Sequence, residues 1–272
     1  MSVPAGYHAE RRQRLEAWLL ATQALWRPQP FKQETPAWAA RHAAFAEHLM
    51  RLTEDEVERI EADPVALIKL VSGTWPELAG LASCIDLPRL EAIEPDGLFA
   101  HQVRDIPGRK QGQIRHFVAA IGPPRAPLLE WCAGKGHLGR ILAHRHGLEV
   151  VSLEIDTGLC QSGARLAARN RIDALQRFVV ADALAPESGQ WCQGRHAIAL
   201  HACGELHRQL IRRVVESAAP ALDLAPCCYY RGVDSAYVPF LPSALKLTPD
   251  DLRLAVRVGQ AKVCLLYTSD AA

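Results

Sequence analysis

The segment Leu128–Arg140, LLEWCAGKGHLGR, constrains the fold of this chain more than any other segment. Two apolar residues lead into a carboxylate, Glu130, and a turn of small residues with Gly134 and Gly136 precedes a helical stretch. A buried strand, a glycine-rich turn and a helix N-terminus form a cradle for a nucleotide, because glycines let a ligand approach the backbone and the helix start offers free N–H groups. A carboxylate here repels a pyrophosphate and attracts a cationic ligand with an amino group, so Glu130 narrows the class of nucleotide.

Two further acids end the next two strands that the sequence predicts. Glu154 closes the segment VVSLE, and its distance from the glycine turn suits an acid that accepts both ribose hydroxyls of a nucleotide. Asp182 follows the segment FVVA, where a carboxylate can accept an adenine amino hydrogen. A single acid of this kind is more often a helix N-cap or a solvated turn residue. Three strand-end acids in this order favour a ligand that carries adenosine.

From Pro127 onward, short apolar strands alternate with helices. This pattern predicts an α/β fold with a doubly wound, mostly parallel sheet that helices cover on both faces, and with ligands at the carboxyl ends of the strands. The predicted strands are 128–132, 148–153, 177–180, 197–201 and 222–228, and the predicted helices include 158–171 and 205–218.

The residues before this pattern predict an N-terminal helical subdomain. Apolar residues recur at helical spacing over Arg11–Trp26 and from Pro36 to Leu52, and the segment from Thr53 to Glu56 has the character of a capping box. We therefore divide the 272 residues into a helical cap at 1–100, a basic connector and helix at 101–126, and a third domain at 127–262. The cap is expected to pack on the main domain and shape a substrate surface, or else to be an independent binding module.

Composition excludes a global attraction to nucleic acid or membrane. The chain is 49% hydrophobic and 22% charged with a net charge of +1, which is ordinary for a globular protein. A local positive cluster stands in the connector, where it would meet an acidic substrate such as RNA or form an ordinary solvated helix start. Its members are Arg104, Arg109, Lys110 and Arg115.

The sequence also predicts a cytoplasmic location, with no membrane contact and no dedicated protein partner. No apolar run approaches the roughly 20 residues of a membrane helix. The N-terminus has no apolar signal core, and the eight cysteines show no Cys-x-x-Cys pair, as expected for reduced thiols. The final residues 263–272, VCLLYTSDAA, resemble translated sequencing adapter, so we expect a non-native tail and truncation of the C-terminal strands that complete such a sheet.

Residues 127–230 resemble a class I S-adenosylmethionine-dependent methyltransferase. In that superfamily the first strand ends in an acid followed by a Gly-x-Gly turn, here Glu130 and Ala133-Gly-Lys-Gly136. The resemblance implies a Rossmann-like sheet and S-adenosyl-L-methionine as cofactor. It implies that the turn, with Ala133, Gly134 and Gly136, approaches the methionine moiety, near Glu130. It also implies that Glu154 holds the ribose and that Asp182 recognises the adenine.

Two later motifs resemble one branch of that superfamily. They are His201-Ala-Cys-Gly-Glu-Leu206 and Pro226-Cys-Cys-Tyr229, at the ends of the fourth and fifth predicted strands. Similar motifs occur in the branch that includes the glutathione S-transferase C-terminal domain-containing proteins and bacterial relatives.

The methyl acceptor is expected at the ends of these two strands, where His201, Cys203 and Tyr229 are the candidate catalytic residues. His201, which is also a candidate cofactor contact, is either a general base or a packed strand-end histidine. Tyr229 either stacks on an acceptor base or simply packs. Cys203, Cys227 and Cys228 with His201 offer the S and N ligands that zinc takes, but no pair has zinc-finger spacing, so we expect no metal.

The sequence therefore predicts methyl transfer from S-adenosylmethionine to an unidentified acceptor, which is RNA, a small molecule or a protein. One alternative is an NAD(P)-dependent oxidoreductase, which Glu130 disfavours because a pyrophosphate would have to pass it. The other is a non-catalytic scaffold that binds S-adenosylmethionine or its product.

Overall fold

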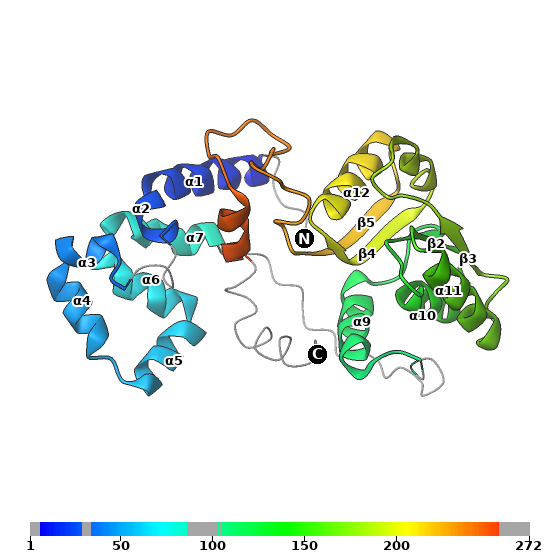
Figure 1. Ribbon diagram of the computed structural model, residues 1–272, viewed down its shortest axis with the longest axis horizontal. Coiled ribbons are helices and arrows are strands. Elements are labelled where there is room, and N and C mark those ends of the chain that lie inside the picture. Colours follow the sequence, from blue (N-terminus) through cyan, green and yellow to red (C-terminus); the bar gives the residue numbers. More distant parts are fainter. Residues whose placement is uncertain (1–5, 29–33, 86–102, 104, 256–272) are drawn as a thin grey trace. The chain divides into compact units, whose positions relative to one another are not determined.

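A parallel five-stranded sheet organises the second half of the chain (Figure 1). The computed structural model describes residues 6–28, 34–85, 103 and 105–255. The strands are β1 (Leu128–Trp131), β2 (Val150–Glu154), β3 (Gln176–Val180), β4 (His196–Cys203) and β5 (Ala221–Cys227). All four neighbouring pairs run parallel, which confirms the predicted α/β fold.

The strand order β3-β2-β1-β4-β5 places β1 at the centre of the sheet. The chain first builds outward from β1 to β3 and then returns to lay β4 on the other side of β1. This reversal makes the carboxyl ends of β1 and β4 a topological switch point, the place where ligands bind in open α/β sheets. The glycine-rich turn follows β1 directly, so it lies at this switch point.

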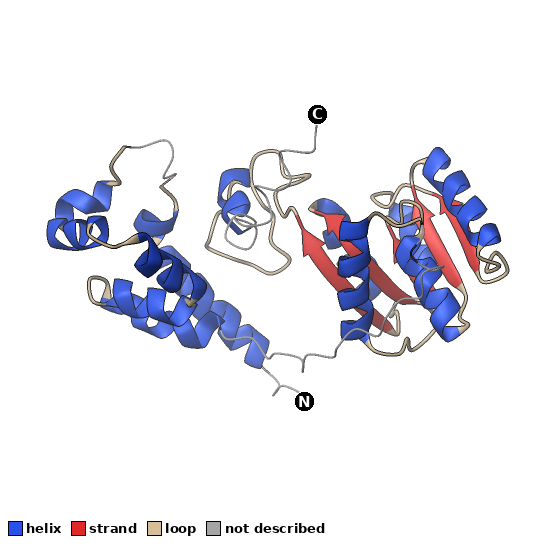
Figure 2. Cartoon of the chain, turned by 90° about the horizontal axis from the view of Figure 1, so that it is seen from below, coloured by secondary structure: helices blue, strands red, loops and turns tan. Residues whose placement is uncertain are grey.

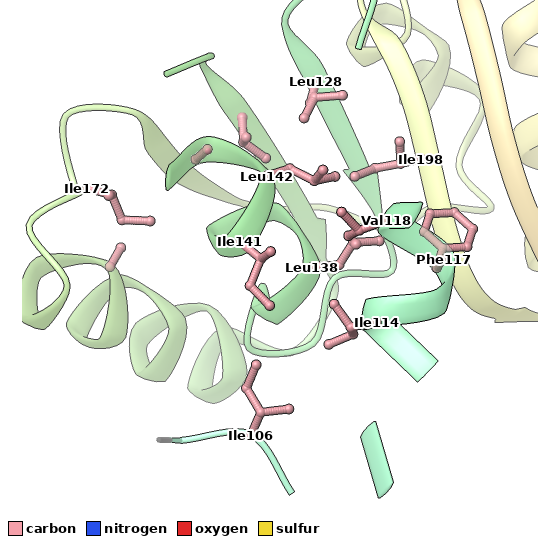
Figure 3. Close-up of a cluster of buried hydrophobic side chains, with 13 residues drawn as sticks. Ile106, Ile114, Phe117, Val118, Leu128, Leu138, Ile141, Leu142, Ile172 and Ile198 are labelled. Carbon is pink, nitrogen blue, oxygen red and sulfur yellow. The ribbon is translucent and has the colours of Figure 1, made fainter. Parts of the chain in front are cut away.

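Helices cover both faces of the sheet, as the apolar strands predict. On one face, α9 (Gly108–Ile121), α10 (His137–His146) and α11 (Thr157–Arg169) pack against the sheet, and Figure 3 shows part of this core. On the other face, α12 (Glu205–Glu216) and the 3-10 helix η3 (Pro186–Trp191) enclose a second core. The residues at the centre of the two cores are Leu128, Ile141, Leu142 and Ile198 on the first face, and Leu129, Trp131, Leu153 and Leu210 on the second.

The N-terminal helices form a separate unit. The chain divides into a helical unit, within Met1–Arg89 and Val238–Leu247, and a sheet unit, within Leu90–Tyr237 and Thr248–Ala272. Figure 2 shows helices and no strands in the described part of the helical unit. Its elements are α1 (Tyr7–Ala21), α2 (Gln23–Trp26), α3 (Ala37–Arg41), α4 (Ala43–Met50), α5 (Glu54–Ala62), α6 (Pro64–Ser72), η2 (Pro76–Gly80) and α7 (Leu81–Ile85).

Two predicted long helices are each broken in this unit. The first breaks at Thr22, whose hydroxyl donates to the Trp18 carbonyl 2.9 Å away, an interaction that bends helices. The second breaks at His42, which leaves helical geometry and packs its ring 4.7 Å from that of Trp75. The capping box at Thr53 and Glu56 is present as predicted.

An aromatic cluster forms the centre of the helical unit. The Trp75 ring lies 5.6 Å from Trp38 and 5.3 Å from Phe45 in edge-on arrangements. A cavity of about 160 Å³ beside this cluster is lined by Trp38, Trp75, Arg41 and Glu77 among others. The segment Val238–Leu247 packs on α1, where the Glu16 carboxylate accepts a 2.7 Å hydrogen bond from Ala244 N.

Some predictions fall beyond the part of the chain that the structure describes. A helix covers residues 249–255, and the predicted non-native tail at 263–272 lies outside the described residues. None of the helices described has the length and apolar composition needed to cross a bilayer.

Candidate functional site

The glycine-rich turn joins β1 to α10 through three residues with left-handed backbone conformation. Cys132, Gly134 and Gly136 have φ of 53°, 59° and 66°. A Cβ on Gly136 would lie 2.5 Å from both the Gln176 amide nitrogen and the Phe178 ring, so only glycine fits there. A Cβ on Gly134 would meet no atom within 4 Å, so this residue faces open space. Ala133 N donates to the Leu153 carbonyl at 2.9 Å and holds the turn over the end of β2.

The Glu130 carboxyl lies beneath the start of α10 and is only 4% exposed. It accepts hydrogen bonds from the Leu138 and Gly139 backbone N–H groups and a 2.7 Å bond from the Ser152 hydroxyl. Burial nevertheless raises its pKa to about 7, because desolvation of the charged form outweighs these hydrogen bonds. The expectation that this carboxylate contacts a ligand remains a prediction, since the partners described here are all protein groups.

Gln176 extends the Glu130 hydrogen-bond chain to the turn itself. Its Nε2 donates to Ser152 Oγ and to the Gly136 carbonyl, both at 2.9 Å. The chain thus runs from β3 through β2 to β1 and back to the turn, in a buried environment where hydrogen bonds are strong. It fixes the shape of the glycine turn from below.

Glu154 closes β2 beside the same turn. Its Oε2 accepts a 2.8 Å hydrogen bond from Gly134 N, and its Oε1 accepts from Ile155 N at 3.0 Å and Asp156 N at 3.1 Å. Asp156 is the N-cap of α11, because its side chain accepts from Leu159 N. The structure therefore brings Glu154 and Gly134 together, as the sequence predicts for a nucleotide cradle.

Asp182 stands exposed beyond the end of β3, where its Oδ1 accepts a 2.8 Å hydrogen bond from Leu184 N. Two apolar side chains near the strand-end acids are also exposed: Ile155 at 63% and Leu184 at 43%. Sequence reasoning passed over both residues. The sequence does contain a signal for them: Ile155 comes directly after the strand-end acid Glu154, and Leu184 comes two residues after the strand-end acid Asp182.

His201 lies in a bulge near the end of β4. The pairing with β5 shifts between Leu200 and Cys203, and His201 has a φ of 67°. Its Nε2 lies 3.0 Å from the Gln113 side-chain oxygen of α9. Burial, with a smaller contribution from the Lys110 charge, lowers the pKa of His201, so the imidazole favours its neutral form.

The cysteines at the ends of β4 and β5 converge. The sulfur atoms of Cys203, Cys227 and Cys228 all lie within 4.8 Å of one another, and Cys203 Sγ is 3.1 Å from Cys227 Sγ. Burial raises the pKa of the Cys203 and Cys227 thiols. Tyr229 packs its ring edge-on against His207 of α12, with the ring centres 5.5 Å apart.

The loop after β5 is fastened to the start of α12. Gly204 has no room for a Cβ, because the Arg231 carbonyl occupies that position, and Glu205 N donates to the same carbonyl at 3.0 Å. The Glu205 carboxylate forms 2.6 Å ion pairs with Arg208 and Arg212. The backbone N–H of Glu205 therefore holds the loop, while its carboxylate pairs only with residues of α12.

The predicted basic cluster falls partly on α9. Arg109, Lys110 and Arg115 lie on this helix and are exposed, whereas Arg104 lies outside the described residues. α9 packs on the first core through Ile114 and Phe117, which are buried. All three cations are exposed on this helix, which contacts His201 through Gln113, and Lys110 lies one helical turn before Ile114.

One family model matches part of this chain. Residues 109–232 match the family model described as a methyltransferase domain. This segment contains the sheet, the glycine turn and the converging cysteines. Residues 109–232 are thus similar to a methyltransferase domain.

One relative and two solved structures illustrate the likeness. The glutathione S-transferase C-terminal domain-containing protein of Xenopus laevis is 29% identical over 126 residues, which are 44% of this chain and 19% of that protein, so the chain spans about a fifth of its length. The RNA methyltransferase from Salinibacter ruber in complex with S-adenosyl-L-homocysteine is 14% identical, with a TM-score of 0.35 over 47% of this chain and 84% of that one. The geranyl diphosphate C-methyltransferase from Streptomyces coelicolor is 17% identical, with a TM-score of 0.31 over 42% and 44% of the two chains.

Proposed function

We propose that the sheet unit binds S-adenosylmethionine and transfers its methyl group to an acceptor. One observation carries this proposal: the glycine turn, Glu154 and Asp182 follow three adjacent strands, β1, β2 and β3, in spatial order along one edge of the sheet. The match to a methyltransferase domain over residues 109–232 supports it.

The residues along this edge fit the parts of the cofactor. Gly134 faces open space, which admits the methionine moiety close to the backbone. Glu154 offers carboxylate oxygens to the ribose hydroxyls, and the exposed Asp182 offers one to the adenine amino group. The exposed side chains of Ile155 and Leu184 supply apolar surface for the adenine faces. When bound, the cofactor supplies an activated methyl group on a sulfonium, so the protein mainly has to position donor and acceptor.

The hydrogen bonds of Glu130 disfavour an NAD(P)-dependent oxidoreductase. A dinucleotide places its pyrophosphate on the free N–H groups at a helix start. At the start of α10, the Leu138 and Gly139 N–H groups already donate to Glu130. A pyrophosphate would have to displace a buried carboxyl group to reach them. A ligand without phosphates meets no such competition.

Binding measurements separate these functions. We expect S-adenosyl-L-homocysteine to bind in titration calorimetry and NAD not to bind. Asp182→Ala and Glu154→Ala should each weaken S-adenosyl-L-homocysteine binding at least tenfold without loss of secondary structure. Asp173→Ala is the matched control, since Asp173 is an exposed aspartate just before β3 rather than after it. NAD binding without S-adenosyl-L-homocysteine binding would overturn the proposal.

The catalytic roles of His201, Cys203 and Tyr229 are also proposals. A neutral imidazole with a lowered pKa suits a general base, and Gln113 orients the ring of His201. His201→Ala should lower the methylation rate while leaving S-adenosyl-L-homocysteine affinity within a few fold. Methyl transfer to pools of RNA, protein or small molecules tests activity. Binding without any transfer would favour the non-catalytic scaffold.

RNA is the acceptor class that the surface of α9 favours. Arg109, Lys110 and Arg115 are exposed on this helix, and the Lys110 charge lies close enough to His201 to lower its pKa. Lys110→Glu should weaken RNA binding and reduce its salt dependence without changing S-adenosyl-L-homocysteine affinity. An unchanged RNA affinity of the Lys110→Glu variant would argue against RNA as the acceptor class. A cytoplasmic location remains part of the proposal, supported by the seven free cysteines among the described residues.

A further inference from the structure

We propose that Cys203, Cys227 and Cys228 bind a thiophilic divalent metal ion, of which Zn²⁺ is the expected example. The proposal starts from their convergence: all three sulfur atoms lie within 4.8 Å of one another, with Cys203 Sγ and Cys227 Sγ 3.1 Å apart. All three are free thiols at intermediate burial, so a metal ion can reach them. The proposal does not depend on the methyltransferase function.

The fold builds this cluster through strand pairing rather than through local spacing. β4 uses three residues to pass from Leu200 to Cys203 while β5 uses two to pass from Ala225 to Cys227, so β4 carries one extra residue. Without this bulge, Ala202 would pair with Cys227. With it, Cys203 does. Cys228 then turns back toward the other two thiols with a φ of 47°. Zinc-finger spacing is therefore not needed to assemble three ligands.

The sulfur positions are close to those that a tetrahedral metal requires. Two thiolates, each about 2.3 Å from Zn²⁺, lie about 3.8 Å apart in tetrahedral geometry. The Cys203–Cys227 separation of 3.1 Å needs to open by about 0.7 Å, and the remaining pairs, which lie at most 4.8 Å apart, need to close by at most about 1 Å. Small side-chain rotations suffice for both.

Binding exchanges protons for a metal ion and moves no electrons. Burial keeps the thiols of Cys203 and Cys227 protonated near neutral pH. On binding, three S–H bonds break, three metal–sulfur bonds form and three protons pass to solvent. The Arg231 guanidinium lies near Cys203, where its charge favours the thiolate form and partly offsets burial.

Three protein ligands leave one coordination position open. Zinc sites that hold four protein ligands are closed, whereas sites with three bind water or a substrate in the fourth position. The three cysteines stand at the carboxyl ends of β4 and β5, the same edge of the sheet that carries the glycine turn. A metal at this place would favour a soft nucleophile such as a thiol as its fourth ligand.

The experiment uses the full chain, purified in a phosphine reductant and freed of metal by chelation. We expect Zn²⁺ to bind with one equivalent per chain and Co²⁺ to give the near-ultraviolet charge-transfer absorption of a thiolate site. Differential alkylation with mass spectrometry of the native chain should show Zn²⁺ protecting Cys203, Cys227 and Cys228, and the chelator restoring their reactivity. This readout needs no mutation.

Matched variants then assign the ligands. Cys203→Ser, Cys227→Ser and Cys228→Ser should each weaken Zn²⁺ binding at least tenfold, while Cys84→Ala in the helical unit should leave it unchanged. Lack of uptake, protection of other cysteines, or a Cys203–Cys227 disulfide in a chain that binds no metal after reduction would each overturn the proposal. Titration with S-adenosyl-L-homocysteine on the same samples tests the methyltransferase function separately.

Discussion

Replacement of Glu130 by glutamine tests how the buried carboxyl supports the glycine turn. The folded chain holds the pKa of Glu130 at about 7, against 4.5 for the exposed group. Between these values the folded state binds more protons than the unfolded state, so stability falls as pH rises from 4.5 to 7. At 1.36 kcal/mol per pH unit, this loss amounts to about 3 kcal/mol at pH 8.

Glutamine keeps the shape of the side chain and does not titrate. The free energy of unfolding of Glu130→Gln, minus that of the native chain, should therefore increase by about 3 kcal/mol between pH 4.5 and pH 8. The substitution also changes the hydrogen bond to Ser152, but this adds the same amount to the difference in unfolding free energy at every pH and does not alter its pH dependence. His137, whose pKa burial lowers to about 4, titrates in both chains, and its contribution cancels in the difference.

Urea unfolding at a series of pH values, followed by circular dichroism and fluorescence, measures both free energies. Glu149→Gln is the control, because it removes an exposed carboxylate that precedes β2. A flat difference would show that burial does not govern the Glu130 carboxyl. A difference of opposite slope would refute the reasoning altogether, since it would mean that the α10 N–H groups and Ser152 hold the carboxylate in its charged form.

Further predictions concern the turn and the opposite end of the sheet. Gly136→Ala should cost about 2 kcal/mol in urea unfolding, because its methyl group meets Phe178 at a positive φ. Gly134→Ala should retain the fold, with strain of about 1 kcal/mol, and bind S-adenosyl-L-homocysteine at least tenfold more weakly. Asp223→Ala removes the 2.7 Å partner of buried His196 and should cost about 1–3 kcal/mol without changing S-adenosyl-L-homocysteine affinity. If Asp223→Ala also weakened S-adenosyl-L-homocysteine binding, the placement of Asp223 away from the cofactor site would be wrong.

The positions of the strands along the sequence and the place of the glycine turn could be predicted because their signals are local. Short apolar runs mark the strands, and Gly134, Glu154 and Asp182 each stand at or just after a strand end. Parallel pairing then brings these ends to one edge of the sheet. Helix breaks at Thr22 and His42 were missed, since side-chain bonding and aromatic packing override the helical periodicity there.

The partners of Glu130 could not be predicted from the sequence. Ser152 and Gln176 are polar residues inside apolar strands, and only the pairing of β1, β2 and β3 shows that they bond to one another and to the turn. The cysteine cluster is similar, because a bulge in β4 decides which residue faces Cys227. Register and bulges depend on the assembled sheet rather than on residue spacing.

The hydrogen-bond chain beneath the turn joins segments that lie far apart in the sequence. Gln176 reaches the Gly136 carbonyl across 40 residues of sequence, and Ser152 reaches Glu130 across 22. A growing chain in which β1 and α10 have been synthesised, but β3 has not, therefore contains the whole glycine turn but lacks Gln176, which supports the turn from below. The complete site requires β3 to be in place, so a bound cofactor analogue would shift destabilised variants toward the native state by mass action.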